Sequence, residues 1–266
     1  MKAIADGLLA AHDAASLVGL PSEARPGFSI ADGYAVAEHH RLRRIERGEQ
    51  PRGFKIGFTN RGIWDRYGVH APIWGPVWSS TLTLLDSPEA TLSLAGLVQP
   101  RIEPEIVFGF ARAPDAAMNE AELTACIEWV AHGFEIVHTH YEGWRFTAAD
   151  TVADFALHGR LLVGPRVPAS RFADLGGELA ALRVALSRDG SEVEAGVASI
   201  VLDGPLAALR TWLDSMRVDS PHWQVRAGDV VTTGTITDAW PIKAGEHWQT
   251  RLSDPRLAGL SLTIEA

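Results

Sequence analysis

The first 50 residues carry apolar side chains at the spacing of helices. One helical face within residues 2–19 is formed by Ile4, Leu8, Leu9, Ala11 and Ala15. Further on, Ser29 can cap a second helix, because its hydroxyl can accept the amide hydrogen of Asp32 while the Asp32 carboxylate returns the contact. The charged stretch 38–47 is most simply the solvated face of this helix.

From residue 54 onward the apolar positions form short runs separated by Gly, Pro and Asp, which is typical of β-strands. These runs predict strands near residues 54–58, 81–85, 103–110, 134–139, 159–163, 181–187, 229–233 and 259–265. Two helices are expected between them. One begins at Asn119, where Glu122 completes a capping box, and extends to about His132. The other begins near Pro205, and its apolar stripe is formed by Leu206, Leu209, Leu213 and Met216.

This order of elements predicts an α+β fold. We expect residues 1–50 to form an N-terminal helical section packed on the core, and residues 51–266 to form a β-rich catalytic domain. The length allows a sizeable buried core, and the hydrophobic fraction of 46% and charged fraction of 21% are ordinary for a soluble globular protein.

Composition also bounds the location and partners. No apolar run approaches the roughly 20 residues that span a bilayer. Asp6 interrupts the apolar stretch that a secretory signal would need. The lone Cys126, in the predicted helix and facing the core, excludes an internal disulfide and suits a reducing compartment, so we expect a cytoplasmic protein. The net charge of −9 argues against a nucleic-acid partner. A small anionic substrate would need local positive charge from a metal, Lys55 and Arg101.

Three glutamates point to metal chemistry. Glu103 and Glu105 lie two positions apart in a predicted strand, so both carboxylates face the same way among Ile, Val and Phe side chains. Glu135 lies in a similar apolar run. Uncompensated carboxylates in such surroundings are costly, and an all-oxygen cluster suits Mg²⁺ or Mn²⁺ better than zinc. The alternative is an exposed edge strand with two solvated glutamates.

Several motifs, in matching order and spacing over nearly the whole chain, resemble the 2-keto-4-pentenoate hydratase and 4-oxalocrotonate decarboxylase group of the fumarylacetoacetate hydrolase superfamily. They are Ile30-Ala31-Asp32-Gly33-Tyr34-Ala35, Gly53-Phe54-Lys55-Ile56-Gly57-Phe58-Thr59, Tyr67-Gly68-Val69 with Pro72 and Gly75, Pro100-Arg101-Ile102-Glu103-Pro104-Glu105, Phe134-Glu135-Ile136-Val137, Asp150-Thr151-Val152-Ala153-Asp154 and Gly228-Asp229-Val230-Val231-Thr232-Thr233-Gly234.

The resemblance implies a mixed β-roll or barrel core, a role in the catabolism of aromatic compounds, and a homo-oligomer. It implies a metal-dependent hydratase that adds water to a 2-hydroxy-2,4-dienoate, the enol form of a 2-oxo-4-enoate, and gives a 4-hydroxy-2-oxo acid. The ion would act as a Lewis acid on the dienolate. A 2-oxo-acid decarboxylase, a C–C bond hydrolase on the same scaffold and a catalytically silent binding relative stay open.

The resemblance also suggests roles for individual residues. Lys55 matches the active-site lysine of the group, where it could bind the substrate carboxylate or transfer a proton with a lowered pKa; otherwise it is a strand-end lysine that reaches solvent. Arg101 would contact substrate or orient a metal-binding glutamate. Asp154 would orient a metal-bound water or a residue that supports a metal ligand, or it would cap a helix. Thr235 is a candidate for substrate binding.

Departures from the group's pattern predict an altered pocket. His70 and Ile73 replace two acids, Phe155 and Leu157 replace Asn and Ser, and His138-Thr139-His140 replaces Asp-Ser-Arg. Proton transfer would then use other groups, with His70, His140 and His158 as candidates. We expect the substrate tail to meet an apolar wall formed by Ile73, Trp74, Phe155 and Leu157, which favours an alkyl or aryl tail over a second carboxylate.

Overall fold

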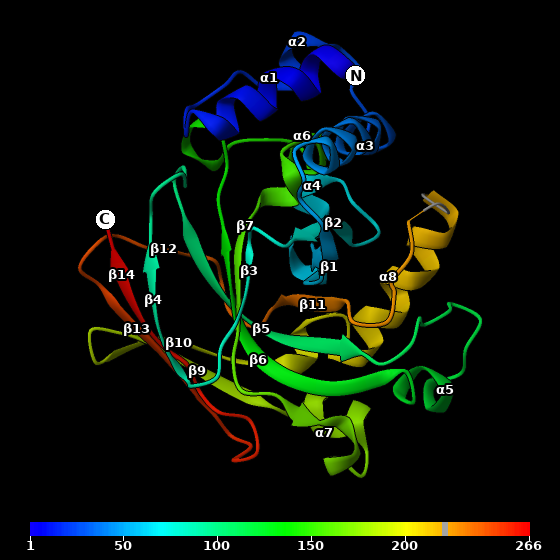
Figure 1. Ribbon diagram of the computed structural model, residues 1–266, viewed down its shortest axis with the longest axis vertical. Coiled ribbons are helices and arrows are strands. Elements are labelled where there is room, and N and C mark those ends of the chain that lie inside the picture. Colours follow the sequence, from blue (N-terminus) through cyan, green and yellow to red (C-terminus); the bar gives the residue numbers. More distant parts are fainter. Residues whose placement is uncertain (220–222) are drawn as a thin grey trace.

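The computed structural model describes the whole chain except residues 220–222. Helices α1 (Lys2–Asp13), α2 (Pro21–Ala24) and α3 (Ile30–Glu46) come first and lie at the top of Figure 1. The predicted capping box of α3 is confirmed, because the Asp32 amide donates to Ser29 Oγ at 3.1 Å and the Ser29 amide donates to Asp32 Oδ2 at 3.0 Å. The first helix ends at Asp13, earlier than the predicted residue 19.

The N-terminal helices pack on a helix from the middle of the chain, α6 (Ala148–Ala153). Their shared apolar cluster consists of Ala5, Leu8, Phe28, Val36, Tyr141, Ala149 and Ala153. Gly33 allows the close approach of α3 and α6, since a Cβ at this position would lie 2.7 Å from the Ala149 carbonyl oxygen. The helical section is thereby joined to the segment that follows the central strands.

Two sheets form the β-rich part of the described residues. The larger sheet has nine strands, with the main order β2-β1-β11-β5-β6-β7-β3, while β12 pairs with β5 and β8 pairs with β6. Its strands are β1 (Pro51–Gly57), β2 (Ile73–Trp78), β3 (Leu82–Leu84), β5 (Arg101–Phe110), β6 (Ile127–Val137), β7 (His158–Val163), β8 (Val167–Pro168), β11 (Val230–Thr235) and β12 (Trp240–Pro241). Pairing is mixed, because β1 runs parallel to β11 while β5 is antiparallel to both β11 and β6.

The smaller sheet has five strands in the order β10-β9-β13-β14-β4. They are β4 (Glu89–Ser93), β9 (Arg183–Arg188), β10 (Ser191–Val197), β13 (His247–Leu252) and β14 (Ser261–Glu265). The long strands β5 and β6 lie side by side and bend together across the middle of the molecule (Figure 1). An apolar cluster including Ile102, Ile136 and Trp248 fills the space between the two sheets.

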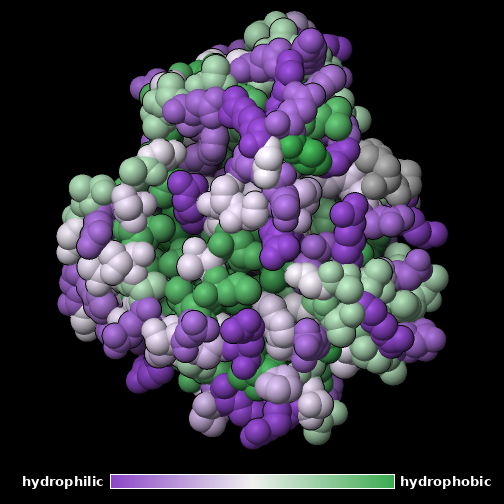
Figure 2. All heavy atoms as spheres, in the orientation of Figure 1, coloured by the Kyte–Doolittle hydropathy of each residue, from purple (hydrophilic) through white to green (hydrophobic). Residues whose placement is uncertain are grey.

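The other helices are α4 (Trp64–Tyr67), α5 (Glu120–Thr124), α7 (Leu175–Ala180) and α8 (Pro205–Asp219). The apolar stripe of α8 is confirmed: it packs on Phe54, Trp74 and Val231 of the larger sheet. Hydrophobic side chains also reach the surface at the centre of the face in Figure 2, below the N-terminal helices. Within the described residues, the helices are all too short or too polar to cross a membrane.

The predicted helix from Asn119 to about His132 is wrong beyond Thr124. Its capping box exists, with the Glu122 amide donating to Asn119 Oδ1 at 3.0 Å, but β6 begins at Ile127. Pairing with β5 along nearly all of β6 supplies backbone hydrogen bonds between two largely buried strands, and this tertiary gain overrides the local helical spacing. Cys126 is buried, but it lies in the turn that joins α5 to β6.

Strands β2, β4, β8, β10, β12 and β13 are not among the predicted strands. In β2, Gly75 and Pro76 locally indicate a loop. A strand can contain this proline because β2 lies at the end of the sheet order, where a missing amide donor breaks no ladder on its outer side. The register of β1 and β2 pairs Lys55 with Gly75, so β2 forms one wall beside the predicted site.

Candidate metal centre and substrate cavity

The three glutamates predicted to bind a metal meet across β5 and β6. The antiparallel register places Glu103 directly opposite Glu135, and Glu105 follows two positions along on the same face. One carboxylate oxygen from each residue lies within 4.8 Å of the others. Glu105 and Glu135 are fully buried, with exposed fractions of 1% and 0%. The alternative of an exposed edge strand does not hold, because β5 lies between β11 and β6 in the sheet.

The donor atoms of this cluster fit a hard divalent cation. Glu105 Oε2 accepts the Gly234 amide at 2.8 Å, and Glu135 Oε1 accepts from His158 at 2.9 Å. The remaining oxygens, Glu105 Oε1 and Glu135 Oε2, are buried without a hydrogen-bond partner. Buried carboxylate oxygens without a partner are costly, and oxygen-only donors are those that Mg²⁺ and Mn²⁺ prefer.

Among the ion pairs of the described residues, Lys55 on β1 is the one lysine or arginine that contacts the three glutamates. Its Nζ lies 3.5 Å from Glu135 Oε2, and the side chain is buried. Burial acts to lower the pKa of Lys55, but the three carboxylates outweigh it, so the pKa is raised. The expected lowering of this pKa is therefore wrong. Three ionised carboxylates and one ammonium leave two negative charges, which a divalent ion would match.

The same crowding raises the pKa of each carboxyl group. Burial is the largest cause for all three glutamates, and Lys55 opposes it. For Glu103 the neighbouring Glu135 and Glu105 add to the effect, and its pKa rises to about 8. The cluster therefore holds protons near neutral pH that a cation must displace.

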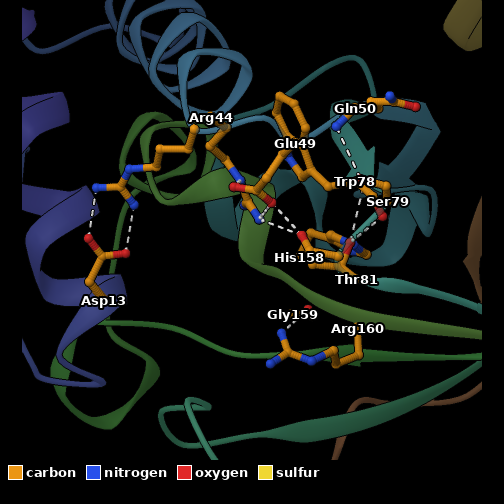
Figure 3. Close-up of polar contacts among 12 residues, drawn as sticks. Asp13, Arg44, Glu49, Gln50, Trp78, Ser79, Thr81, His158, Gly159 and Arg160 are labelled. Carbon is orange, nitrogen blue, oxygen red and sulfur yellow. Dashed lines mark hydrogen bonds and ion pairs between the residues drawn. The ribbon is translucent and has the colours of Figure 1, made fainter.

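His158 orients Glu135 from behind. Its Nδ1 lies 2.9 Å from Glu135 Oε1, and its Nε2 lies 2.8 Å from Thr81 Oγ1 (Figure 3 shows the contact with Thr81). Burial and then Lys55 lower the pKa of His158 well below its ordinary value, so the ring is neutral. Because a carboxylate can only accept, the ring proton belongs on Nδ1 and the Thr81 hydroxyl donates to Nε2. This histidine, a candidate for proton transfer, instead orients Glu135, one of the predicted metal ligands.

A cavity of about 370 Å³ opens next to the carboxylates. Lys55, Glu103 and Glu105 line it, together with Arg101 and Thr235, which were predicted to bind substrate. Its apolar lining consists of Ile56, Phe58, Ile63, Ile73, Val137, Trp144, Phe146, Ala156, Leu157, Ile200, Ile236 and Ala239. The Arg101 guanidinium lies over the Trp144 ring, 4.1 Å from the ring centroid. One part of the cavity is thus charged and another is apolar.

Known proteins resemble this chain in sequence and fold. A 2-hydroxyhexa-2,4-dienoate hydratase from Comamonas testosteroni is 31% identical over 226 residues, which cover 84% of this chain and 82% of that protein. A 4-oxalocrotonate decarboxylase from a Pseudomonas species is 29% identical over 88% of both chains. No family model matches the chain. The chain belongs to the 2-keto-4-pentenoate hydratase and 4-oxalocrotonate decarboxylase group.

Solved structures share the fold of this chain. The 4-oxalocrotonate decarboxylase from Pseudomonas putida G7, complexed with magnesium and adipate, superposes with a TM-score of 0.89 at 24% identity, over 99% of this chain and 96% of that one. A fumarylpyruvate hydrolase from Pseudomonas aeruginosa, in complex with Mn²⁺ and pyruvate, superposes with a TM-score of 0.62 at 16% identity, over 80% and 89%. The predicted family and fold class are confirmed.

Other residues predicted for the site lie elsewhere in this family member. Trp74 is buried in the core against Phe54 and Trp212, outside the cavity lining. His70 is exposed and also lies outside the lining. Phe155 does not line the cavity; its ring stacks on His40, with ring centroids 4.2 Å apart. Asp154 is fully buried, and its carboxylate is hydrogen-bonded to the His140 ring.

Several cavity residues had no predicted role. Tyr67 ends α4 and Phe146 lies on a loop, while Ile200, Glu194 and Asp238 come from distant segments. The signal for Tyr67 was present, because it belongs to a motif shared with the family. No local pattern marks the others, since only the tertiary fold brings their segments to the cavity.

Replacing Glu105 by Gln should weaken Mg²⁺ or Mn²⁺ binding, because a neutral amide is a poorer ligand for a hard cation. The loss should exceed the roughly 10- to 100-fold that is typical when a residue hydrogen-bonded to a metal ligand is removed. Isothermal titration calorimetry on the purified protein would measure the affinity. Glu128→Gln is the matched control, since Glu128 is an exposed glutamate on the neighbouring strand, β6. Equal affinities of the two variants would contradict the assignment.

The raised carboxyl pKa values predict how metal binding depends on pH. A group with a raised pKa keeps its proton up to that pH, so the ion must displace protons below it. We expect the apparent Mg²⁺ affinity to increase from about pH 6.5 to about pH 8.5, with proton release on binding at the lower pH. Calorimetry in two buffers of different ionisation enthalpy measures both quantities. An affinity independent of pH would contradict this account.

Proposed function

We propose that this chain is a divalent-metal-dependent hydratase that adds water to a 2-hydroxy-2,4-dienoate, the enol of a 2-oxo-4-enoate, and yields a 4-hydroxy-2-oxo acid in the catabolism of aromatic compounds. The observation that carries the proposal is the carboxylate cluster of Glu103, Glu105 and Glu135 at a cavity that also holds Lys55 and Arg101. The names of the relatives support it, since they include a 2-hydroxyhexa-2,4-dienoate hydratase and 2-keto-4-pentenoate hydratases.

The charged residues of the cavity suit a substrate with a carboxylate beside an enol or keto oxygen. Mg²⁺ or Mn²⁺ bound by the three glutamates would supply Lewis-acid stabilisation of the negative charge that develops on the substrate oxygens. Arg101 lies at the same cavity, and its guanidinium is held against Trp144, so it can pair with the substrate carboxylate. This local charge answers the objection that the whole chain carries a net charge of −9.

Lys55 would serve as an ammonium. The three carboxylates raise the pKa of Lys55 in the metal-free site, and an Nζ ammonium can stabilise developing negative charge or deliver a proton. Burial beside the cavity excludes bulk water from Nζ. Thr235, also on the lining, would bind substrate.

Decarboxylation of a 2-oxo acid is the second candidate function. It is favoured by relatives named 4-oxalocrotonate decarboxylase, one of which is 29% identical over 88% of this chain. C–C bond hydrolysis uses the same scaffold, and a silent binding relative is the remaining alternative because Ile73 and Leu157 replace polar residues of the group. These reactions differ in the mass of their products.

The proposal predicts both a product and a substrate preference. Ile73 and Leu157 on the cavity wall would leave a terminal carboxylate without a partner, at a cost of several kcal/mol, whereas an apolar tail gains about 25 cal/mol per Å² buried. We expect a phenyl-substituted dienoate to have a higher kcat/KM than a dienoate that ends in a carboxylate. Mass spectrometry of the product should show the addition of one water.

Loss of CO₂ would favour the decarboxylase, and cleavage into two fragments would favour the hydrolase. Metal-dependent binding of both substrates without turnover would favour the silent relative. A preference for the carboxylate-terminated substrate would show that a cation near the cavity, such as Arg101, serves the tail.

Lys55→Met should lower kcat/KM by about 10²-fold or more, which is the usual scale of acid–base catalysis. Mg²⁺ affinity should not fall, because the substitution removes a positive charge beside Glu135. Steady-state kinetics and calorimetry on the same preparation separate these effects. Lys243→Met, at an exposed lysine, is the matched control. Full activity in Lys55→Met, or loss of metal binding with it, would contradict the proposed role.

We also propose that the protein is cytoplasmic and forms a homo-oligomer. The free, buried thiol of Cys126 is compatible with a reducing compartment. The oligomeric state is supported only by the family resemblance, and light scattering after gel filtration would measure it.

A further inference from the structure

Three histidines form a second cluster of possible metal ligands. His12 lies near the end of α1, while His138 and His140 follow directly after β6. One ring nitrogen from each lies within 4.8 Å of the others. The ring centroid of His12 is 5.6 Å from that of His138 and 5.6 Å from that of His140, and the last two are 4.8 Å apart. None of these residues lines the cavity beside the carboxylates.

The nitrogens of this cluster are buried and lack partners. His138 and His140 have exposed fractions of 1% and 0%, and no hydrogen bond reaches His12 Nδ1, His138 Nε2 or His140 Nε2 within the described residues. Burial, followed by the Arg44 charge, lowers the pKa of His12 to about 4. Burial, followed by His140, lowers the pKa of His138 to about 3. These two rings are therefore neutral near pH 7, the state in which imidazole binds metals.

Asp154 supplies the partner that a metal-binding histidine needs. Its Oδ1 lies 2.5 Å from His140 Nδ1, and its Oδ2 accepts from the His140 amide and from Thr139 Oγ1, both at 2.9 Å. Since the carboxylate can only accept, Nδ1 of His140 carries a proton, and the metal-binding nitrogen of this ring would be Nε2. A carboxylate–histidine pair of this kind orients and strengthens metal-binding histidines in proteins.

We propose that His12, His138 and His140 bind a transition-metal ion of the Zn²⁺ class, at a site separate from the carboxylate centre. Imidazole nitrogens suit Zn²⁺, Co²⁺, Ni²⁺ or Cu²⁺, whereas the three glutamates suit Mg²⁺ or Mn²⁺, so the two clusters differ in the ion that they select. Three protein ligands leave one position of a tetrahedral ion for water.

Two features oppose binding of the ion, and one of them makes His138 a weaker ligand than His12 and His140. His138 Nδ1 accepts the Val98 amide at 3.2 Å, so this ring must move its proton to Nδ1 and give up that contact before Nε2 can bind. His138 is accordingly the weakest of the three ligands. Arg44 and Arg160 add positive charge nearby. Arg44 is largely neutralised, because its Nε and Nη2 donate to Glu49 at 2.8 and 2.7 Å (Figure 3). At His138, the Asp154 charge opposes that of Arg160.

The ion would connect α1 to the end of β6. α1 otherwise meets this region through apolar packing, in the cluster that contains Leu8 and Tyr141. β6 also carries Glu135, three residues before His138. The expected consequence is a structural one: the ion should raise the thermal stability of the protein by fixing the N-terminal helix.

Cobalt titration of the metal-free full-length protein tests the site, with Mg²⁺ in excess to occupy the carboxylate centre. We expect one equivalent of Co²⁺ to bind with the visible absorption of a tetrahedral nitrogen-ligated ion, to be displaced by Zn²⁺, and to raise Tm. His12→Ala should weaken this binding at least about tenfold, and Asp154→Asn by roughly 10- to 100-fold. Glu103→Gln should retain it.

His39→Ala is the matched control, because His39 is a histidine of α3 outside the cluster, and it should bind Co²⁺ as the wild type does. Mg²⁺ affinity verifies that each variant is folded, and His12→Gln serves if His12→Ala is not. The proposal is overturned if the wild type takes up no Co²⁺ in excess Mg²⁺, or if the folded His12 variant takes it up with unchanged affinity.

Discussion

The burial of three like-charged carboxylates between β5 and β6 is the constraint on which the rest of the structure depends. Glu103 and Glu135 face each other across the two strands, and Glu105 lies beside them. Without compensation, this arrangement would repel itself in surroundings of low dielectric constant. The carboxylates therefore need a positive charge and hydrogen-bond donors close to them, and the neighbouring elements provide both.

Each compensating group comes from a different element. Lys55 arrives on β1, the Gly234 amide on β11 and His158 on β7. Gly234 is required at its position, since its φ is 104° and a Cβ there would lie 1.8 Å from Thr59 Oγ1. These strands are neighbours in the order β1-β11-β5-β6-β7. The sheet topology therefore determines which groups surround the three carboxylates.

The residues that depart from the family pattern fall into two groups. Ile73 and Leu157 line the cavity and make it apolar. His138 and His140 instead lie next to His12 of α1, and Asp154 binds His140. Substitutions that looked like one altered pocket in the sequence therefore lie in two places, and only those on the cavity wall line the cavity.

The sequence by itself determined the elements and residues whose signals are local. Capping at Ser29, the stripe of α8 and the spacing of Glu103 and Glu105 depend on neighbours within a few residues, and the ordered motifs identified the family. Tertiary structure alone decided that β6 replaces a predicted helix, that Trp74 belongs to the core, and that the pKa of Lys55 rises. These outcomes depend on strand pairing and on charges brought together from distant segments, which no local pattern records.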